Sequence, residues 1–430
     1  MTDPFETLTH TGPGTPMGRF MRQYWIPAAR SSELVADGPP VRLMLLGEKL
    51  VAFRDSAGRI GILDHRCPHR CASLFYGRNE ENGLRCVYHG WKYDVDGRCL
   101  EMANVPPHQD FKDKVRAKAY LAREKSGLVW VYMGERETAP DLPPFEAALL
   151  PEHQIEYRFV QRRCNWLQAI EGDLDTSHLG FLHFGAARPS TNLDTDSKNL
   201  TVNRAPEYKV ADAPFGLTYG AYRPAEGGGT YWRTAHLLFP FWVMPPIAKI
   251  EANVMVRGFI PLDDEHCMFV GIAYNDYLAE NRGRWPLPGA SLIDRLHPNT
   301  TEWLGRYRMI EAEENEYFID RDVQRDKSFT GIEGIHVQDQ MITESMGAII
   351  DRSWENLAPS DIAVVRGRRV LMRALQAFEA GGPAPAAAEP QLYAGVRGGY
   401  YTTKDTGDWL STLKARVAAA PPHFSAAAAQ

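Results

Sequence analysis

Cys67-Pro-His-Arg-Cys-Ala-Ser-Leu74 and Gly83-Leu-Arg-Cys-Val-Tyr-His-Gly-Trp-Lys-Tyr93 decide how this chain is organised. The first stretch contains a C-x-H pair at 67–69 and the second a C-x₂-H pair at 86–89, with 16 residues between the pairs. Four of the six cysteines of the chain lie at 67, 71, 86 and 99. In a reducing compartment, such crowding indicates metal binding rather than disulfides.

Two thiolates and two imidazoles are the ligands of a Rieske [2Fe–2S] cluster, in which two cysteines bind one iron and two histidines the other. Cys67, His69, Cys86 and His89 supply this set. The competing interpretation is a Cys₂His₂ zinc site. Zinc sites usually pair cysteine with cysteine and histidine with histidine, whereas each stretch here supplies one of each. The mixed pairing favours the cluster.

The residues around these pairs predict a small all-β unit, because short apolar runs alternate with Gly and Asp turns. The expected strands are Val41–Leu46, Lys49–Arg54, Ile60–Asp64, Val87–Tyr93 and Gly127–Met133. A Pro-rich linker at 139–144 follows.

The larger remainder mixes helices with strands. A helix is expected over Asn165–His178, and another over Asp361–Ala380 that Ser360 caps and Gly381-Gly382 ends. Further strands are expected at Thr230–Phe239, Lys249–Ile260 and Cys267–Tyr274.

A second polar constellation lies in Glu171-Gly-Asp-Leu-Asp175-Thr-Ser-His178-Leu-Gly-Phe-Leu-His183. At ~100° per residue, Glu171, Asp175 and His178 project within about 60° of one another. His183 falls about 140° from His178 on the same helix, so one ion can bind both only if the chain breaks, and Gly180 offers that break. Two histidines and a carboxylate form the facial triad of non-haem iron. The alternative is two separate hydrogen-bonded core histidines.

The third ligand of such a triad must come from far along the chain. The residues leave five candidates, which are Asp320, Asp322, Asp339, Asp351 and Asp361.

With both constellations in view, the chain resembles the α-subunits of Rieske ring-hydroxylating oxygenases, and most closely their phthalate-4,5-dioxygenase-like branch. Asp175, His178 and His183 match the D-x₂-H-x₄-H motif of that family. The resemblance implies that His178 and His183 bind iron, and that Asp175 hydrogen-bonds an iron-ligating histidine and a cluster-ligating histidine of the neighbouring subunit. It also favours Asp339, which shortly precedes Glu344-Ser345, as the third ligand.

The resemblance implies an α+β fold, with a small all-β Rieske domain and a larger catalytic domain whose antiparallel sheet is covered by helices in a helix-grip-like arrangement. We expect an N-terminal segment at 1–39 that packs on the catalytic domain, the Rieske domain at 40–144, the catalytic domain at 145–417 and a disordered tail at 418–430. Cys71 is interpreted as a bystander thiol, and the role of Glu171 is left open.

The implied function is that of a terminal oxygenase, which uses O₂, a [2Fe–2S] cluster and Fe(II) to hydroxylate an aromatic, carboxylated substrate. Electrons would come from a separate flavin/iron–sulfur reductase, because no G-x-G-x-x-G fingerprint follows a strand here. A homotrimer or two stacked trimers would bring the cluster of one subunit to the iron of the next. An aromatic O-demethylase is the alternative reaction, and a Rieske electron carrier without oxygenase activity or a zinc-stabilised binding module are the alternative classes.

The composition of the chain limits which partners it is expected to bind. A net charge of −6 without an excess of Lys and Arg argues against nucleic acid. No apolar run is long enough to cross a bilayer and no signal peptide is visible, so a cytoplasmic location is expected. A substrate carboxylate would favour arginine as its partner, and Arg204 and Arg233 are the candidates for that contact.

Overall fold

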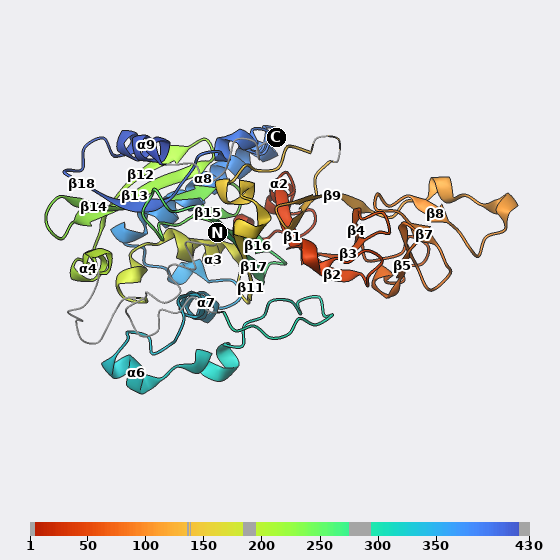
Figure 1. The fold of residues 1–430 in the computed structure, drawn as a ribbon, viewed down its shortest axis with the longest axis horizontal. Coiled ribbons are helices and arrows are strands. Elements are labelled where there is room, and N and C mark those ends of the chain that lie inside the picture. The colour runs from red at the N-terminus through yellow and green to blue at the C-terminus, as the bar shows by residue number, and fades with distance from the viewer. Residues whose placement is uncertain (1–4, 136, 138, 184–194, 275–293, 421–430) are drawn as a thin grey trace.

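The computed structural model describes residues 5–135, 137, 139–183, 195–274 and 294–420. The molecule is elongated, with a smaller β part at one end and a larger body of sheet and helices at the other (Figure 1). This arrangement confirms the predicted α+β class.

Two antiparallel sheets build the smaller part. The larger of them has the order β1-β10-β9-β4-β3-β2, and the other has the order β5-β6-β7-β8. Their strands are β1 (Trp25–Arg30), β2 (Val41–Leu45), β3 (Glu48–Arg54), β4 (Ile60–Asp64), β5 (Arg78–Glu80), β6 (Gly83–Arg85), β7 (Lys92–Tyr93), β8 (Cys99–Glu101), β9 (Ala119–Lys125) and β10 (Leu128–Tyr132).

The predicted strands at 41–46, 49–54, 60–64 and 127–133 are therefore confirmed, whereas the one at Val87–Tyr93 is wrong. Only Lys92 and Tyr93 form strand there. Residues 86–91 instead close a tight turn, in which the Gly90 amide donates to the Cys86 carbonyl at 2.9 Å. The apolar residues of this stretch therefore belong to a turn and not to a strand.

The N-terminal residues contact both parts of the molecule. β1 pairs with β10 in the six-stranded sheet. The short helices α1 (Glu6–Thr9) and α2 (Pro16–Met21) belong to the body, where Phe20 meets Phe378 edge-on with ring centroids 5.6 Å apart. The segment thus ties the small part to the body.

The body is built on an antiparallel sheet with the order β11-β17-β16-β15-β14-β13-β12, to which β18 adds by pairing with β14. Its strands are β11 (Ile155–Arg162), β12 (Glu207–Ala213), β13 (Gly216–Pro224), β14 (Thr230–Leu238), β15 (Trp242–Met244), β16 (Met255–Pro261), β17 (Cys267–Tyr274) and β18 (Gly399–Thr403). The expected strands at 230–239 and 267–274 are confirmed. The one at Lys249–Ile260 begins only at Met255. Before it, the Ile250 amide donates to the Tyr400 carbonyl, and the Ala252 amide closes a turn with the Lys249 carbonyl.

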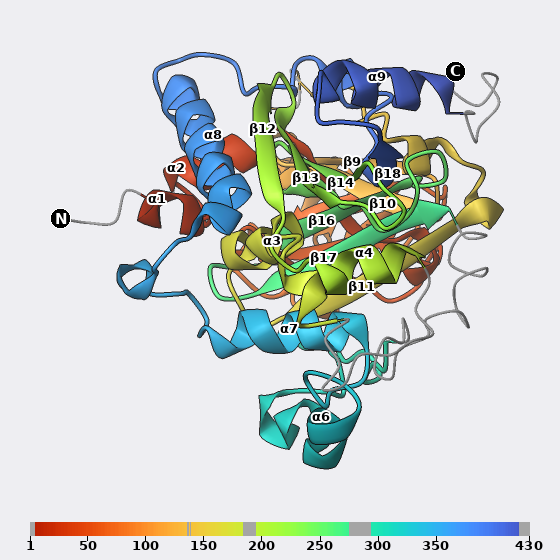
Figure 2. The same cartoon turned by 90° about the vertical axis from the view of Figure 1, so that its left-hand side faces the viewer.

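Helices cover this sheet, as predicted. α8 (Ile362–Glu379) packs on β12 and β13, and α3 (Trp166–Leu174) lies between β16 and α7 (Ile335–Ser345). Figure 2 shows α9 (Trp409–Ala419) along one edge of the body and α6 (Arg321–Asp326) at the opposite edge. α4 (Thr195–Val202) packs on the short turn at His178–Gly180. The expected tail at 418–430 starts too early, because α9 continues to Ala419, and residues 421–430 lie outside the described part.

Candidate metal centres

The polar constellation at 171–183 lies where α3 ends. Asn165 caps α3 by accepting the Leu167 amide at 3.0 Å, and the apolar residues of the helix are buried against the sheet. The predicted extension of this helix to His178 is wrong. Asp175 is already extended, and its carboxylate accepts the Ser177 amide at 2.6 Å and the Ser177 hydroxyl at 2.7 Å. Such local side-chain bonds compete with helical ones, so the helix stops at Leu174.

The next turn brings the two histidines together. His178 opens a short 3-10 turn, His178–Gly180, and the chain then returns so that Nε2 of His178 lies 3.1 Å from Nε2 of His183. The break that the sequence required for these two rings is therefore present, although it begins at Asp175 rather than at Gly180.

Asp339 completes a group of three. It lies on α7, far along the chain, and its Oδ1 is 3.1 Å from Nε2 of His183 and 3.7 Å from Nε2 of His178. One ligand atom from each residue lies within 4.8 Å of the other two. Two imidazole nitrogens and a carboxylate oxygen that converge in this way fit an iron site with open positions.

Neighbouring groups set the protonation states that this site requires. His183 Nδ1 lies 2.8 Å from Oε1 of Gln338, whose own amide nitrogen donates to the Ile332 carbonyl at 2.7 Å. Gln338 therefore offers an acceptor, so Nδ1 of His183 carries the hydrogen and Nε2 the lone pair. Burial would raise the pKa of Asp339, but the nearby imidazoles of His183 and His178 hold it well below its usual range. Asp339 is thus a carboxylate at neutral pH.

The other carboxylates proposed as the third ligand have different partners. Asp320 caps α6, Asp322 pairs with Arg325 at 2.7 Å, Asp351 accepts the Ser353 amide, and Asp361 accepts the Ala358 amide. Glu171 points away from the histidines toward Arg368 and Arg352. None of these residues joins the group that Asp339 makes with the histidines.

The cysteine–histidine pairs sit on two loops at the far end of the small part. The His69 and His89 rings approach with centroids 4.5 Å apart, and Trp91 stacks on His69 at 4.2 Å. The thiols of Cys67 and Cys86 are buried and in contact, and burial is the main reason why the pKa of Cys86 is raised.

One observation at these loops tests the fit of a cluster. Nδ1 of His89 is buried and has no hydrogen-bond partner among the described residues. A buried polar atom left unpaired is costly, and it is explained if that nitrogen binds a metal. Two thiols and two imidazoles, one of which has an unpaired ring nitrogen, fit the ligand set of a [2Fe–2S] cluster. Cys71 is exposed, with a left-handed backbone (φ +60°).

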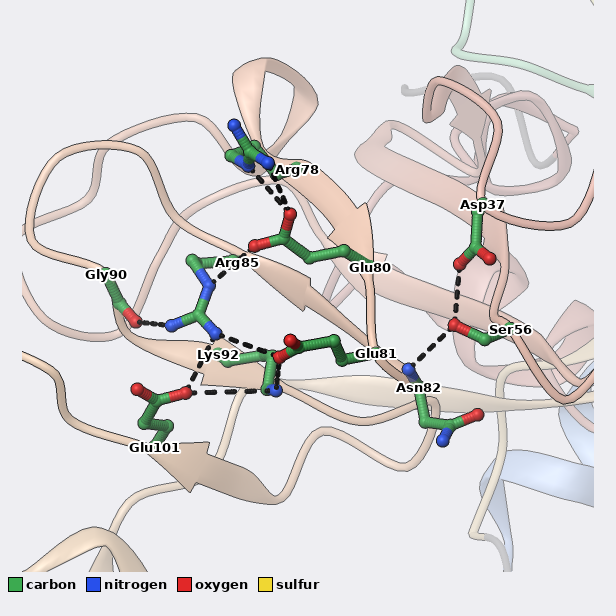
Figure 3. Close-up of polar contacts among 10 residues, drawn as sticks. All are labelled: Asp37, Ser56, Arg78, Glu80, Glu81, Asn82, Arg85, Gly90, Lys92 and Glu101. Atoms are coloured by element: carbon green, nitrogen blue, oxygen red, sulfur yellow. Dashed lines mark hydrogen bonds and ion pairs between the residues drawn. The ribbon is translucent and has the colours of Figure 1, made fainter.

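A network of charges holds the second ligand loop (Figure 3). Arg85, at the end of β6, donates to the Gly90 carbonyl at 3.0 Å, to Glu80 at 2.9 Å and to Glu101 at 2.8 Å. Lys92 lies 3.0 Å from Glu81 in the same network. Because Gly90 closes the turn that begins at Cys86, Arg85 fixes the turn between the two ligands of this loop.

The two arginines proposed as substrate contacts lie in different environments. Arg204 is half-buried, donates to the Thr201 carbonyl at 3.3 Å and stacks over Phe181. Arg233, on β14, is buried and donates to the Thr176 hydroxyl at 2.9 Å, directly beside Asp175. A third arginine, Arg223 on β13, lies two residues from Ala221, which pairs with Arg233.

Both parts of the chain match known protein families. Residues 24–115 match the Rieske [2Fe-2S] domain, and residues 131–421 match the family described as "LigXa C-terminal domain like". The chain is 46% identical, over 97% of its length and 98% of the relative, to the 3-chlorobenzoate-3,4-dioxygenase oxygenase subunit of Comamonas testosteroni. The chain belongs to the Rieske aromatic-ring oxygenases. It is a terminal oxygenase subunit of that family, with a [2Fe–2S] cluster and a mononuclear non-haem iron as cofactors.

Further relatives agree with this assignment. The oxygenase is 37% identical to the phthalate 4,5-dioxygenase oxygenase subunit of Pseudomonas putida, over 85% of the chain and 84% of that protein. The crystal structure of dicamba monooxygenase bound to dicamba shares the fold, with a TM-score of 0.58 and 18% identity over 84% of this chain and 99% of that one. The zinc module and the electron carrier without oxygenase activity are therefore rejected. Within the part of the chain that the structure describes, no helix is long and apolar enough to span a bilayer.

Proposed function

We propose that this oxygenase hydroxylates an aromatic carboxylate, with His178, His183 and Asp339 as the iron ligands and Cys67, His69, Cys86 and His89 as the cluster ligands. The observation that carries the proposal is the convergence of Nε2 of His178, Nε2 of His183 and Oδ1 of Asp339 within 4.8 Å. The substrate class is supported by the 3-chlorobenzoate and phthalate dioxygenase relatives.

When bound, the cluster supplies single electrons, and the mononuclear iron supplies the place where O₂ is activated beside the substrate. The chain provides the setting. Asp175 holds the Nδ1 proton of His178, so that Nε2 keeps its lone pair for the metal. Gln338 does the same for His183. Leu179, which follows His178, and Ile335, which begins the helix that carries Asp339, pack with Leu200 in one apolar cluster.

Electron supply is the second part of the proposal. We infer that a separate flavin/iron–sulfur reductase delivers electrons to the loops at 67–69 and 86–89, and that Asp175 links a cluster-ligating histidine of a neighbouring subunit to His178. The ligand loops lie at one end of the elongated molecule, whereas α3 and α7 lie in the body (Figure 1). A closed ring of heterologous contacts overcomes that separation. We therefore propose a homotrimer or two stacked trimers, in the cytoplasm, where the six free cysteines stay reduced.

The reaction is tested by O₂ uptake with a surrogate reductase over benzoates, phthalates and methoxylated aromatic acids. We expect one class to stimulate uptake and to yield a hydroxylated product. His178→Ala should abolish uptake while the visible spectrum of the cluster remains. The proposal would be contradicted if none of these acids stimulated O₂ uptake, or if the His178→Ala variant turned over a substrate. The molar mass by light scattering should be that of three or six subunits, and a monomer would contradict the ring.

The ligand assignment has its own test. Asp339→Ala should lose the mononuclear iron, and Asp351→Ala, whose carboxylate caps an exposed turn, should retain it. Iron analysis of both proteins, normalised to cluster absorbance, measures the difference. Equal iron in the two variants would rule out Asp339 as a ligand.

O-demethylation is the second candidate reaction, because the chain is 31% identical to the 5,5'-dehydrodivanillate O-demethylase oxygenase subunit of Sphingobium sp. (strain NBRC 103272 / SYK-6). Labelling with ¹⁸O₂ separates the two. A dioxygenase places two labelled atoms in the product, whereas a demethylase leaves an unlabelled phenol oxygen on the ring and releases formaldehyde.

A further inference from the structure

Two buried arginines lie next to each other in the body, and no carboxylate of the described residues pairs with either of them. Arg223 is 3% exposed and Arg233 is 4% exposed. Nη1 of Arg223 donates to the carbonyls of Asn203 at 2.8 Å and Leu200 at 3.4 Å, but its Nε and Nη2 are buried and have no hydrogen-bond partner among the described residues. Two of the three nitrogens of this guanidinium are therefore unsatisfied.

The strand register places both arginines on one face of the sheet. Arg223 pairs with Tyr231, and Ala221 pairs with Arg233, across β13 and β14. Residues that pair directly share a face, and so do residues two apart on one strand. Arg223 and Arg233 are thus diagonal neighbours, and the positive charge of Arg233 is one reason, after burial, why the pKa of Arg223 falls to about 10. Arg223 still carries its charge at neutral pH.

Charge balance separates this pair from most buried arginines of the described residues. Arg306, Arg368 and Arg397 each contact a glutamate, whereas neither Arg223 nor Arg233 forms an ion pair there. Arg162 also has no ion pair among these residues, but its guanidinium lies over the rings of Phe259 and Phe269. Among the residues that the structure describes, Arg233 donates to two neutral hydroxyls, those of Thr176 at 2.9 Å and Tyr231 at 3.5 Å. An uncompensated buried charge is strongly unfavourable, so this pair fits an anion that is not part of the described chain.

The pair is connected to the metal triad at both ends. Thr176, which receives the Arg233 hydrogen bond, lies two residues before His178. Tyr231 packs in the same apolar cluster as Leu179, which follows His178, and Ile335, which begins the helix that carries Asp339. The two arginines therefore contact segments that also carry ligands of the triad.

We propose that Arg223 and Arg233 together bind the carboxylate of the aromatic substrate and so determine specificity for anionic rings. The inference rests on the proposed function. Of the two arginines expected from the sequence, it keeps Arg233 and leaves out Arg204, and it adds Arg223. Guanidinium groups suit this role because their planar donors match both oxygens of a carboxylate. Arg204 already stacks on Phe181 outside this pair.

Calorimetric titration of the purified holoenzyme with benzoate and with benzamide tests the inference. Benzamide has nearly the same shape but no charge. We expect wild type to bind benzoate more tightly than benzamide, and Arg223→Met to weaken benzoate by about 10- to 100-fold with little effect on benzamide. The matched control is Arg373→Met, because Arg373 is exposed on α8 and pairs with Asp212. The affinity of this variant for both ligands should equal that of wild type.

Each contrary outcome has a defined meaning. If wild type binds both ligands equally, the inference is overturned even if Arg223→Met does not fold. If Arg223→Met weakens both ligands alike, Arg223 merely supports the end of α4, and if only Arg204→Met discriminates, the carboxylate site is elsewhere. Measurements of O₂ uptake separate this inference from the proposed reaction. If benzoates stimulate uptake equally in wild type and in Arg223→Met, only the inference is overturned. If binding is selective for the carboxylate but no uptake follows, only the reaction is overturned.

Discussion

Oδ2 of Asp175 lies 3.5 Å from Nδ1 of His178, on the side of the imidazole ring opposite the one that faces His183 and Asp339. Burial disfavours the protonated ring, yet the carboxylate of Asp175 raises the pKa of His178 above its usual value. One aspartate therefore fixes both the tautomer and the orientation of the histidine that we assign to the iron.

Asp175→Asn should weaken iron binding or turnover by about 10- to 100-fold, because an amide does not hold the Nδ1 proton as a carboxylate does. Iron content and O₂ uptake measure the effect, and the cluster spectrum should stay unchanged. Ser177→Ala removes only a donor to the same carboxylate and should have a smaller effect. Wild-type iron and turnover in Asp175→Asn would refute this role.

Tyr93→Phe should lower the reduction potential of the cluster. The Tyr93 hydroxyl lies 3.4 Å from Sγ of Cys67, and burial keeps the pKa of the phenol above its usual value, so it is a donor to a thiolate. Such a bond stabilises the more negative, reduced cluster, and its loss should shift the potential down by about 20–60 mV. Redox titration measures the shift. Tyr88→Phe, whose ring is half exposed, is the control and should leave the potential unchanged.

Glu171→Gln should destabilise the fold without removing iron. The Glu171 carboxylate accepts from Arg368 at 2.7 Å and from Arg352 at 3.0 Å, and both arginines are buried. Both arginines keep Glu355 as a second partner, so the loss of the Glu171 charge should cost about 1–3 kcal/mol. Chemical denaturation measures the loss, with Arg366→Ala as an exposed ion-pair control worth at most about 1 kcal/mol. Loss of iron at unchanged stability would instead make Glu171 part of the metal site.

His236 should make stability depend on pH between about 4 and 6.5. Burial lowers its pKa to about 4, and its neutral ring lies 2.9 Å from the Thr218 hydroxyl and 2.9 Å from the Arg397 carbonyl. The unfolded chain, with an ordinary histidine pKa of about 6.5, binds the proton first. The contribution of neutral His236 to the free energy of unfolding is therefore complete above pH 6.5, and it falls by about 3 kcal/mol as the pH drops to 4. Denaturation curves of wild type and His236→Asn should converge over that range, and parallel curves would contradict the assignment.

Much of the architecture was predictable because it depends on local pattern. The spacing of Cys67, His69, Cys86 and His89 was sufficient for the cluster domain, and apolar periodicity located β3, β14, β17 and α8 to within two residues. The errors arose where a polar side chain or a turn overrode the pattern. Asp175 ends α3 early by bonding Ser177, and the turn that Gly90 closes replaces the strand expected at 87–91.

The sequence by itself therefore indicated the two cysteine–histidine pairs and the candidate histidines His178 and His183, because ligand type and short spacing are local properties. Only the tertiary structure decided which distant groups meet. It brought Asp339 rather than Asp320 or Asp351 to the histidines, turned Glu171 toward Arg368, and placed Arg223 beside Arg233. These contacts depend on how helices pack on the sheet and on strand register, which join residues that are far apart in the chain.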